Sequence, residues 1–282
     1  MFPIVETERL APTLTRYVVA APLIARKRQA GHFVIVRVEE GGERIPLTIV
    51  DSDAAAGTIT LIVQAVGKTT KLLATLGAGD ALRDVLGPLG QPTPIERHGR
   101  VGCVGGGVGA AELLPIARAL RAAGNRLHGV LGARTRELVI LERELDACCE
   151  SLVVTTDDGS HGRRGVVTQP LRDALEAGLL DAVYAIGPLP MMKAVAETTR
   201  PFGVKTFVSL NAVMVDGTGM CGGCRVSVGG EMKFACVDGP EFDGHLVDFD
   251  ELMRRNRTYA DEERAADQAF TCAAQAAAEV RQ

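Results

Sequence analysis

The sequence predicts an antiparallel β-barrel followed by a parallel α/β domain, a metal-binding segment and a helical tail. Three observations carry this prediction. Short apolar or alternating runs, separated by turn residues, fill residues 1–97. Over residues 98–208, apolar strands alternate with helix-forming stretches, which implies crossover connections and a parallel sheet. Residues 209–250 then contain three of the seven cysteines.

The composition excludes several classes of protein. A net charge of -4 offers no basic surface for nucleic acid, and a chain without tryptophan has little area for base stacking. The sequence does not open on a secretory signal, and no apolar run approaches the roughly 20 residues of a membrane helix. An odd number of cysteines favours thiolates in a reducing compartment over a disulfide framework. We therefore expect a cytoplasmic protein with neither a nucleic-acid nor a membrane partner.

The first predicted domain, residues 1–97, is a small barrel that binds a cofactor. Its spacing of apolar runs is typical of short antiparallel strands with one helical interruption. The expected strands are Leu14–Ala20, His32–Val38, Ile45–Val50 and Gly57–Val66, the expected helix is Thr69–Leu76, and Gly87–Gly90 is expected to be the closing turn.

Two segments of this barrel carry candidate phosphate-binding groups. An arginine opens the run RIPLT and a hydroxyl closes it, while the run VGKTT opens the predicted helix. Arginine, hydroxyls and helix N–H groups together bind a pyrophosphate, although the same pattern also describes a surface arginine and a well-capped helix. The candidate residues are Arg44, Pro46, Leu47, Thr48, Ile62, Val63, Gln64, Val66, Gly67, Thr69 and Thr70.

The second predicted domain, residues 98–208, has the pattern of a nucleotide-binding α/β unit. The expected strands are Arg100–Val104, Leu127–Gly132, Leu152–Thr156, Ala182–Ile186 and Lys205–Ser209, and the expected helix after the first strand is Ala110–Ala123. Parallel strands joined by helices place their carboxyl ends at one edge of the sheet, where ligands of such domains bind. Any nucleotide site is therefore expected in the loops that follow the strands.

Two loops of this domain follow a strand and precede a helix. The first is GGGVG and the second is GPLPMM. Glycines allow a phosphate to approach the backbone, and the N-terminus of the next helix supplies N–H donors. The spacing departs from the strict G-x-G-x-x-G, and a tight connection without a ligand is the alternative. Two such loops at one edge favour a nicotinamide nucleotide, with candidates Gly105, Gly106, Gly107, Val108, Gly109, Gly187, Pro188 and Met191.

The segment 209–250 carries the predicted metal site. Cys221 and Cys224 form a C-x-x-C, Cys236 follows, and Asp216 precedes the pair at the spacing of a fourth ligand. Three thiolates suit an iron-sulfur cluster or zinc, and His245 would complete a Cys₃His zinc site. The glycines between the ligands favour a loop wrapped around a cluster. An aspartate that only caps the turn is the alternative for position 216.

The final predicted unit, residues 251–282, is a charged and then alanine-rich helical tail. Its run Arg254–Arg257 is either a docking surface for a partner or a solvated face.

The motifs together resemble the ferredoxin-NADP reductase superfamily, in its branch of multisubunit electron-transfer flavoproteins. The resemblance rests on RIPLT, VGKTT, GGGVG, GPLPMMKAV and the C-x-x-C with a later Cys-x-Asp-Gly-Pro, and it covers essentially the whole chain. With Asp216 in the first ligand position, the chain is similar to the small subunits of NADH-dependent reduced ferredoxin:NADP+ oxidoreductases. The related dihydroorotate dehydrogenase electron-transfer subunits have four cysteines there.

This resemblance implies an NAD(P)H-dependent flavin oxidoreductase subunit with FAD on the barrel and NAD(H) on the α/β domain. It implies a 2Fe-2S cluster held by Asp216, Cys221, Cys224 and Cys236. Hydride would pass from NADH to FAD, and single electrons would leave through the cluster. The implied partner is a larger flavin and iron-sulfur subunit in a heterodimer, which bifurcates electrons and reaches ferredoxin.

The chain departs from the superfamily pattern in two places. Ile186 stands before the Gly-Pro of the second loop, where many members have a cysteine, so we predict no catalytic thiol. Leu47 and Thr48 replace an aromatic residue and a serine after the arginine of the flavin motif. The rival interpretations are a dihydroorotate dehydrogenase electron-transfer subunit and a zinc-stabilised interaction subunit without enzymatic activity.

Overall fold

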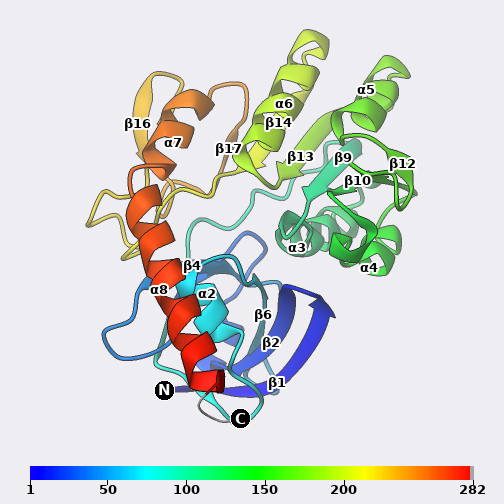
Figure 1. The fold of residues 1–282 in the computed structure, drawn as a ribbon. Coiled ribbons are helices and arrows are strands. Elements are labelled where there is room, and N and C mark those ends of the chain that lie inside the picture. The colour runs from blue at the N-terminus through cyan, green and yellow to red at the C-terminus, as the bar shows by residue number, and fades with distance from the viewer. Residues whose placement is uncertain (280–282) are drawn as a thin grey trace.

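The computed structural model describes the backbone of residues 1–279 and the side chains of residues 1–272. The last three residues of the predicted tail lie outside this part. Figure 1 shows a barrel built from the first third of the chain, an α/β unit from the middle third, and a hairpin with two helices from the remainder. The predicted fold class, a barrel followed by a parallel α/β domain, is confirmed.

The barrel consists of two antiparallel sheets around one apolar core. The five-stranded sheet has the order β5-β6-β2-β1-β7, and the three-stranded sheet has the order β4-β3-β8. Tyr17, Val36 and Ile59 are among the core side chains, each at most 2% exposed. The elements are β1 (Phe2–Ala11), β2 (Leu14–Ala20), α1 (Pro22–Ala25), β3 (Phe33–Arg37), β4 (Arg44–Thr48), β5 (Asp51–Asp53), β6 (Thr58–Gln64), α2 (Lys68–Leu73), β7 (Ala81–Leu82) and β8 (Asp84–Leu89).

Two features of the barrel differ from the sequence prediction. The first strand, β1, was not predicted, because Val5, Glu6 and Glu8 are exposed and its apolar residues do not alternate cleanly. The predicted turn at Gly87–Gly90 is wrong, since Gly87 to Leu89 belong to β8. This strand lies at the edge of its sheet and has a register shift opposite Phe33 and Ile35, which are positions that tolerate proline.

The α/β unit is a seven-stranded sheet with the order β12-β11-β10-β9-β13-β14-β17, in which only β17 runs antiparallel to its neighbour. Helices α3 and α4 pack on one face, and α5 and α6 pack on the other. The predicted strands are all present within two residues of their expected ends. The elements are β9 (Arg100–Gly106), α3 (Gly109–Ala122), β10 (Arg126–Ala133), a 3₁₀ turn (Arg136–Leu138), α4 (Glu142–Asp146), β11 (Ser151–Thr156), β12 (Arg163–Arg164), α5 (Thr168–Glu176), β13 (Ala182–Ile186), α6 (Leu189–Thr199), a 3₁₀ turn (Arg200–Phe202) and β14 (Lys205–Ser209).

The C-terminal part leaves the sheet at β14 and returns to it at β17. Its elements are β15 (Arg225–Val228), β16 (Glu231–Phe234), β17 (Glu241–Asp243), α7 (Phe249–Asn256) and α8 (Ala260–Glu279). Helix α8 lies along the barrel beside α2, where Lys71 Nζ is 2.7 Å from Asp267 Oδ2 (Figure 1). The predicted helical tail is therefore two helices with a break between them.

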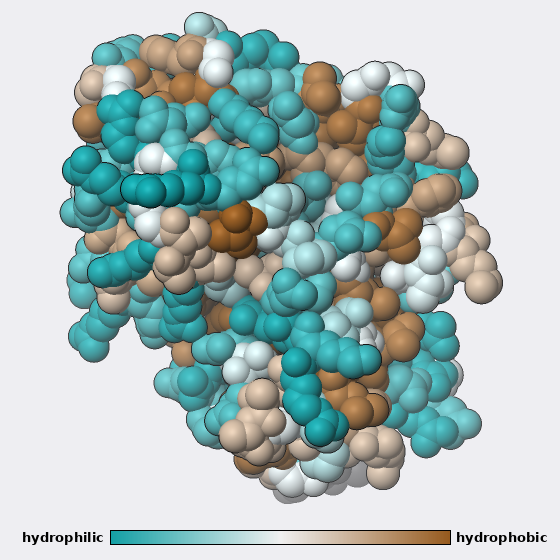
Figure 2. All heavy atoms as spheres, turned by 180° about the vertical axis from the view of Figure 1, so that it is seen from behind, coloured by the Kyte–Doolittle hydropathy of each residue, from teal (hydrophilic) through white to brown (hydrophobic). Residues whose placement is uncertain are grey.

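The surface is ordinary in character. Seen from behind, polar side chains cover most of the visible face and hydrophobic ones are scattered among them (Figure 2). Among the helices of the described chain, none has both the length and the apolar character needed to cross a bilayer.

Candidate cofactor-binding site

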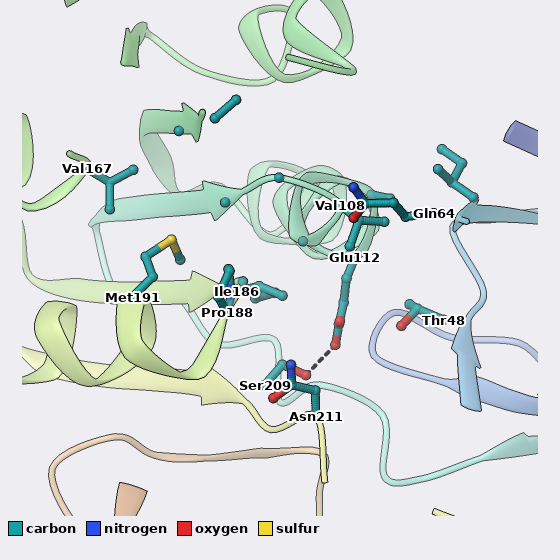
Figure 3. Close-up of a pocket in the computed structure, with 18 of the residues that line it drawn as sticks. Thr48, Gln64, Val108, Glu112, Val167, Ile186, Pro188, Met191, Ser209 and Asn211 are labelled. Carbon is teal, nitrogen blue, oxygen red and sulfur yellow. Dashed lines mark hydrogen bonds between the residues drawn. The ribbon is translucent and has the colours of Figure 1, made fainter. Parts of the chain in front are cut away.

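A pocket of about 920 Å³ lies between the barrel and the carboxyl edge of the parallel sheet. Three groups of segments line it, namely the barrel strands, the two glycine loops and the chain that follows β14 (Figure 3). Of the predicted cofactor-binding residues, those that line the pocket are Pro46, Leu47, Thr48, Ile62, Gln64, Gly106, Gly107, Val108, Gly109, Gly187, Pro188 and Met191.

The two glycine loops touch each other across the neighbouring strands β9 and β13. A Cβ atom at Gly109 would collide with the carbonyl oxygen of Ile186 and would lie 2.8 Å from the Cα of Gly187. Gly107 has a φ of +56°, and its N–H donates to the carbonyl of Gly132 at 2.9 Å. The prediction that both loops lie at one edge of the sheet is confirmed, and α3 begins directly behind the first loop.

The other predicted cofactor residues do not line the pocket. Gly105 is buried within β9, and the Val63 side chain packs in the barrel core. Arg44 is exposed at the start of β4. At the N-terminus of α2, Thr70 Oγ1 accepts hydrogen bonds from the N–H groups of Val66 and Gly67. Thr69 donates to Glu43. These contacts match the well-capped helix that the sequence left as an alternative.

The floor of the pocket contains the acidic side chain of Glu112, and a second one, Glu241, lies behind Ser209; the sequence analysis selected neither. Ser209 Oγ contacts Oε1 of Glu112, and it lies 3.2 Å from Oε1 of Glu241 (Figure 3 shows the first contact). Burial raises the pKa of Glu112, and hydrogen bonds from Ser209 and Thr48 oppose the rise. Burial, together with the neighbouring Glu112, raises the pKa of Glu241 to about 8. A carboxyl group in this position retains its proton near neutral pH.

Asp216 begins the predicted metal loop and holds its turn. Its Oδ1 accepts the N–H of Thr218 at 3.0 Å, and its Oδ2 accepts the N–H of Cys221 at 2.7 Å. The hydrogen bond from Thr218 is the main cause that lowers the pKa of Asp216, so the group is ionised at neutral pH. Gly217 and Gly219 have positive φ angles of 71° and 81°, which let the loop close this tightly. The capping role left open for Asp216 is therefore present.

Of the four predicted ligands, the structure brings the sulfur atoms of two together. Cys224 and Cys236 are buried at the base of the β15–β16 hairpin with their sulfur atoms 3.1 Å apart. Cys221 is exposed and is tied through its N–H to Asp216. Within the described residues, no three His, Cys, Asp or Glu side chains surround a single point closely enough to hold one ion. His245 bonds instead to Thr199 at 2.9 Å.

The residues missed by the sequence analysis reach the site in two ways, Glu112 from the first turn of α3 and Glu241 through the sheet. Glu112 is the one acidic residue among the apolar side chains of α3, and that isolation was an available signal. Glu241 stands opposite Ser209 in the β14–β17 ladder, which is invisible without the pairing. Arg134, which the sequence leaves either as a nucleotide contact or as a solvated side chain, lines the pocket, and so does Asp157, which was not selected.

Comparison with known proteins supports the same architecture. A family model described as the iron-sulfur cluster binding domain of dihydroorotate dehydrogenase B matches residues 211–248. A Thermotoga maritima protein, the dihydroorotate dehydrogenase B (NAD(+)) electron transfer subunit homolog, is 46% identical over 267 residues, covering 95% of this chain and 94% of its own length. The dihydroorotate dehydrogenase B (NAD(+)) electron transfer subunit of Geobacillus kaustophilus is 40% identical over 233 residues, or 78% of this chain and 87% of that subunit.

Solved structures agree. A chain of the NADH-dependent reduced ferredoxin-NADP oxidoreductase, solved in a study of flavin-based electron bifurcation, has a TM-score of 0.92 and 44% identity over 96% of this chain and 98% of its own. A ferredoxin reductase of carbazole 1,9a-dioxygenase, with a TM-score of 0.60 and 21% identity over 72% of this chain and 64% of its own, shows the fold alone. The chain therefore belongs to the family of dihydroorotate dehydrogenase B electron-transfer subunits and their homologues, which has the ferredoxin reductase-like fold.

Proposed function

We propose that the chain is the NADH-oxidising subunit of an electron-bifurcating, NADH-dependent reduced ferredoxin:NADP+ oxidoreductase. The observation that carries this proposal is the pocket of about 920 Å³, which the barrel, the glycine loops and the segment leading to Asp216 line together. A site of this kind suits a reaction in which a hydride is accepted and its two electrons leave one at a time. FAD supplies hydride acceptance and the release of single electrons, and the 2Fe-2S cluster carries those electrons onward.

We assign residues 1–97 to FAD, 98–208 to NAD(H), 209–250 to the cluster and 251–282 to a helical tail. Thr48 and Gln64 supply polar groups on the barrel side of the pocket, among apolar neighbours. A pocket of this composition suits a flat aromatic ring with a few fixed hydrogen bonds. Arg44 and the start of α2 are assigned to the phosphates. Thr70 already occupies the N–H groups of Val66 and Gly67, so a phosphate there depends on other donors.

We assign NAD(H) to the two glycine loops. Cβ atoms at Gly106 and Gly109 would fill the space where the loops meet, so glycine at these positions keeps the backbone accessible. The N-terminus of the long helix α3 lies beside the same space, where the N–H groups of Ala110 and Ala111 bond to the carbonyls of Gly107 and Val108, so a phosphate there depends on the other N–H groups of the loop. Likeness to NADH-dependent relatives supports NADH over NADPH.

We assign the cluster to Asp216, Cys221, Cys224 and Cys236. A binuclear cluster takes four terminal ligands, and this loop supplies one carboxylate and three cysteines, with the sulfur atoms of Cys224 and Cys236 3.1 Å apart. The match also weighs against a single zinc ion, because His245 bonds to α6 rather than approaching the cysteines. A carboxylate carries the same charge as a thiolate but is a harder donor, and Asp216 is therefore proposed to tune the cluster.

The second candidate function is that of a dihydroorotate dehydrogenase electron-transfer subunit. The family model over residues 211–248 favours it. Asp216, at a position where the resemblance to that family implies a cysteine, weighs against it. The two candidates differ in the partner, since one pairs with a larger flavin and iron-sulfur subunit and the other with a dihydroorotate-binding subunit.

The test is purification of the tagged chain from its own cell under anaerobic conditions, with the copurifying subunit identified by mass spectrometry. We expect a flavin spectrum with a broad iron-sulfur shoulder, a larger flavin and iron-sulfur partner, and NADH-dependent reduction of NADP+ that requires reduced ferredoxin. A partner that oxidises dihydroorotate would replace the first candidate by the second. A colourless protein containing zinc would refute both.

A further inference from the structure

The pocket floor holds a chemical group to which the proposed function assigns no role. Glu112 of α3 and Glu241 of β17 approach the same hydroxyl, that of Ser209 at the end of β14. The three residues are distant in sequence and meet because β17 pairs with β14, which sets Ser209 directly opposite Glu241. Figure 3 shows Glu112 pointing from α3 toward Ser209 across the floor.

The hydrogen atoms in this cluster must be shared. Ser209 has a single hydroxyl proton and can donate it to one carboxyl oxygen only. Its second contact is a hydrogen bond only if the other carboxyl group donates to the hydroxyl oxygen. Two carboxyl groups that share one hydroxyl, with no cation bonded to either among the described residues, favour a state in which the pair holds one proton between two acids.

The surroundings offer no positive charge to remove that proton. In the described structure, no lysine or arginine side chain bonds to either carboxyl group, and the groups that face them are neutral hydroxyls. Thr48 of β4 faces Glu112. Thr93, which is 4% exposed and whose Oγ1 lacks a hydrogen-bond partner of good geometry, faces Glu241.

Further ionisable groups of the described chain lie around Tyr184, whose phenol interacts electrostatically with Glu241. Tyr184 of β13 donates to the carbonyl of Pro94, and burial raises the pKa of its phenol, so it stays protonated. Glu96 and the buried thiol of Cys103 also lie beside Tyr184, and His98 contacts the same phenol at 3.2 Å. Among the described residues, none of these side chains forms an ion pair with Glu112 or Glu241.

The proposed function creates a demand for a proton acceptor at this place. A hydride brings one proton and two electrons into the pocket. The electrons leave one at a time through sulfur and iron, which carry no proton. Each hydride therefore leaves one proton behind, and that proton has to be taken up by a base that lines the pocket.

We propose that the carboxyl pair of Glu112 and Glu241, joined by Ser209, accepts this proton and returns it to water. The inference rests on the proposed function. Glu112 is the member that lines the pocket, so it is the group that meets the proton. Glu241 acts through Ser209 and positions the shared proton. In the resting pair one carboxyl is ionised, and uptake of one proton makes both neutral. Loss of one proton to water restores the pair, so atoms and charge balance. In the reverse reaction the pair supplies the proton.

The first test measures the proton itself and needs no turnover. Infrared spectra of the purified protein at neutral pH should contain the carbonyl stretch of a protonated carboxyl group, which shifts in D₂O. Glu241→Gln and Glu112→Gln should each remove or displace this band. Glu176→Gln, on the exposed face of α5, is the matched control and should leave it unchanged. A band that survives in both pocket variants overturns the proposal.

The second test follows proton release from the flavin-loaded protein with a pH-indicator dye in weak buffer, after mixing with NADH and ferricyanide as the one-electron acceptor. In the wild type, proton release should keep pace with flavin bleaching by NADH, whereas in Glu112→Gln we expect it to lag behind bleaching by a factor on the order of 100. Glu112→Asp should recover part of the rate. Normal bleaching with unchanged proton release overturns the inference and leaves the proposed function standing. A protein that binds no flavin overturns both.

Discussion

The pH dependence of stability offers the most direct test of the buried pair. The fold raises the pKa of Glu241 from 4.5 to about 8, so the folded state binds a proton that the unfolded chain has released over this interval. The contribution of Glu241 is most favourable below pH 4.5 and is lost as pH rises toward 8. The free energy of unfolding should therefore fall with rising pH by at most about 1.4 kcal/mol per pH unit within this window.

The variant Glu241→Gln isolates this effect, because the amide copies the shape of the protonated carboxyl and cannot ionise. From pH 5 to pH 8 the wild type should lose up to about 4 kcal/mol relative to the variant. A value near half of that is expected, since Glu241 retains part of its surface exposed to solvent. The assay is urea unfolding followed by circular dichroism, because the chain has no tryptophan for fluorescence.

Two comparisons make the result decisive. Glu176→Gln controls for a lost surface charge and should follow the wild type at every pH. Glu112→Gln removes the neighbouring charge, so it should lower the pKa of Glu241 and move the window toward lower pH. Parallel curves for the wild type and Glu241→Gln would show that the carboxyl group titrates normally, and this would refute the reasoning.

Three further predictions concern the other parts of the path. Gly109→Ala should weaken NADH binding at least tenfold in a titration, because the added Cβ would press on the neighbouring loop. The flavin content should be unchanged. Gly77→Ala, at a position with open space around it, is the control. Asp216→Ala should reduce the iron content per chain. Asp216→Cys should retain iron but change the midpoint potential and the electron paramagnetic resonance signal of the cluster. Unchanged values in Asp216→Cys would contradict tuning by the carboxylate. Lys71→Ala and Asp267→Asn should each destabilise the contact of α8 with the barrel by about 0–1 kcal/mol. Limited proteolysis of α8 should then be faster in both variants than in the wild type. Equal rates of proteolysis in variant and wild type would mean that the ion pair does not hold the helix.

Much of the fold was predictable because periodicity is a local property. The strands β13 and β14 have the predicted bounds, since their apolar residues form short runs between clear turn signals. The strand β8 was not predicted, because a glycine and a proline occupy its middle and only its pairing with β3 makes it a strand. Local patterns identify elements that carry their own signal and miss those that exist through their partners.

The candidate site divides in the same way. The glycine loops were predictable, because strand, loop and helix are consecutive in the chain. Val63 was predicted to bind a cofactor because its whole segment was selected. Successive side chains of a strand point to opposite faces, so Val63 packs in the barrel core while Ile62 and Gln64 line the pocket. Which residues of a strand face a ligand follows from its neighbours in the sheet, and a single sequence does not display them.

The carboxyl pair and the proposed cluster loop are connected through the same stretch of backbone. The chain leaves β14 after Ser209, forms the loop of Asp216 and the three cysteines, and re-enters the sheet at Glu241. The N–H of Leu210 bonds to the carbonyl of Pro240 at 2.9 Å, which closes the excursion just beyond Ser209 and Glu241. A movement of the cluster loop, for instance when a partner docks on it, would therefore pull on both ends of this closure and change the contact between Ser209 and Glu241. If the contact holds the shared proton, the proposed one-electron exit and the proposed proton acceptor would be mechanically coupled through this closure. Variants that alter the closure, unlike variants at the tip of the β15–β16 hairpin, should then change proton release and the midpoint potential of the cluster together.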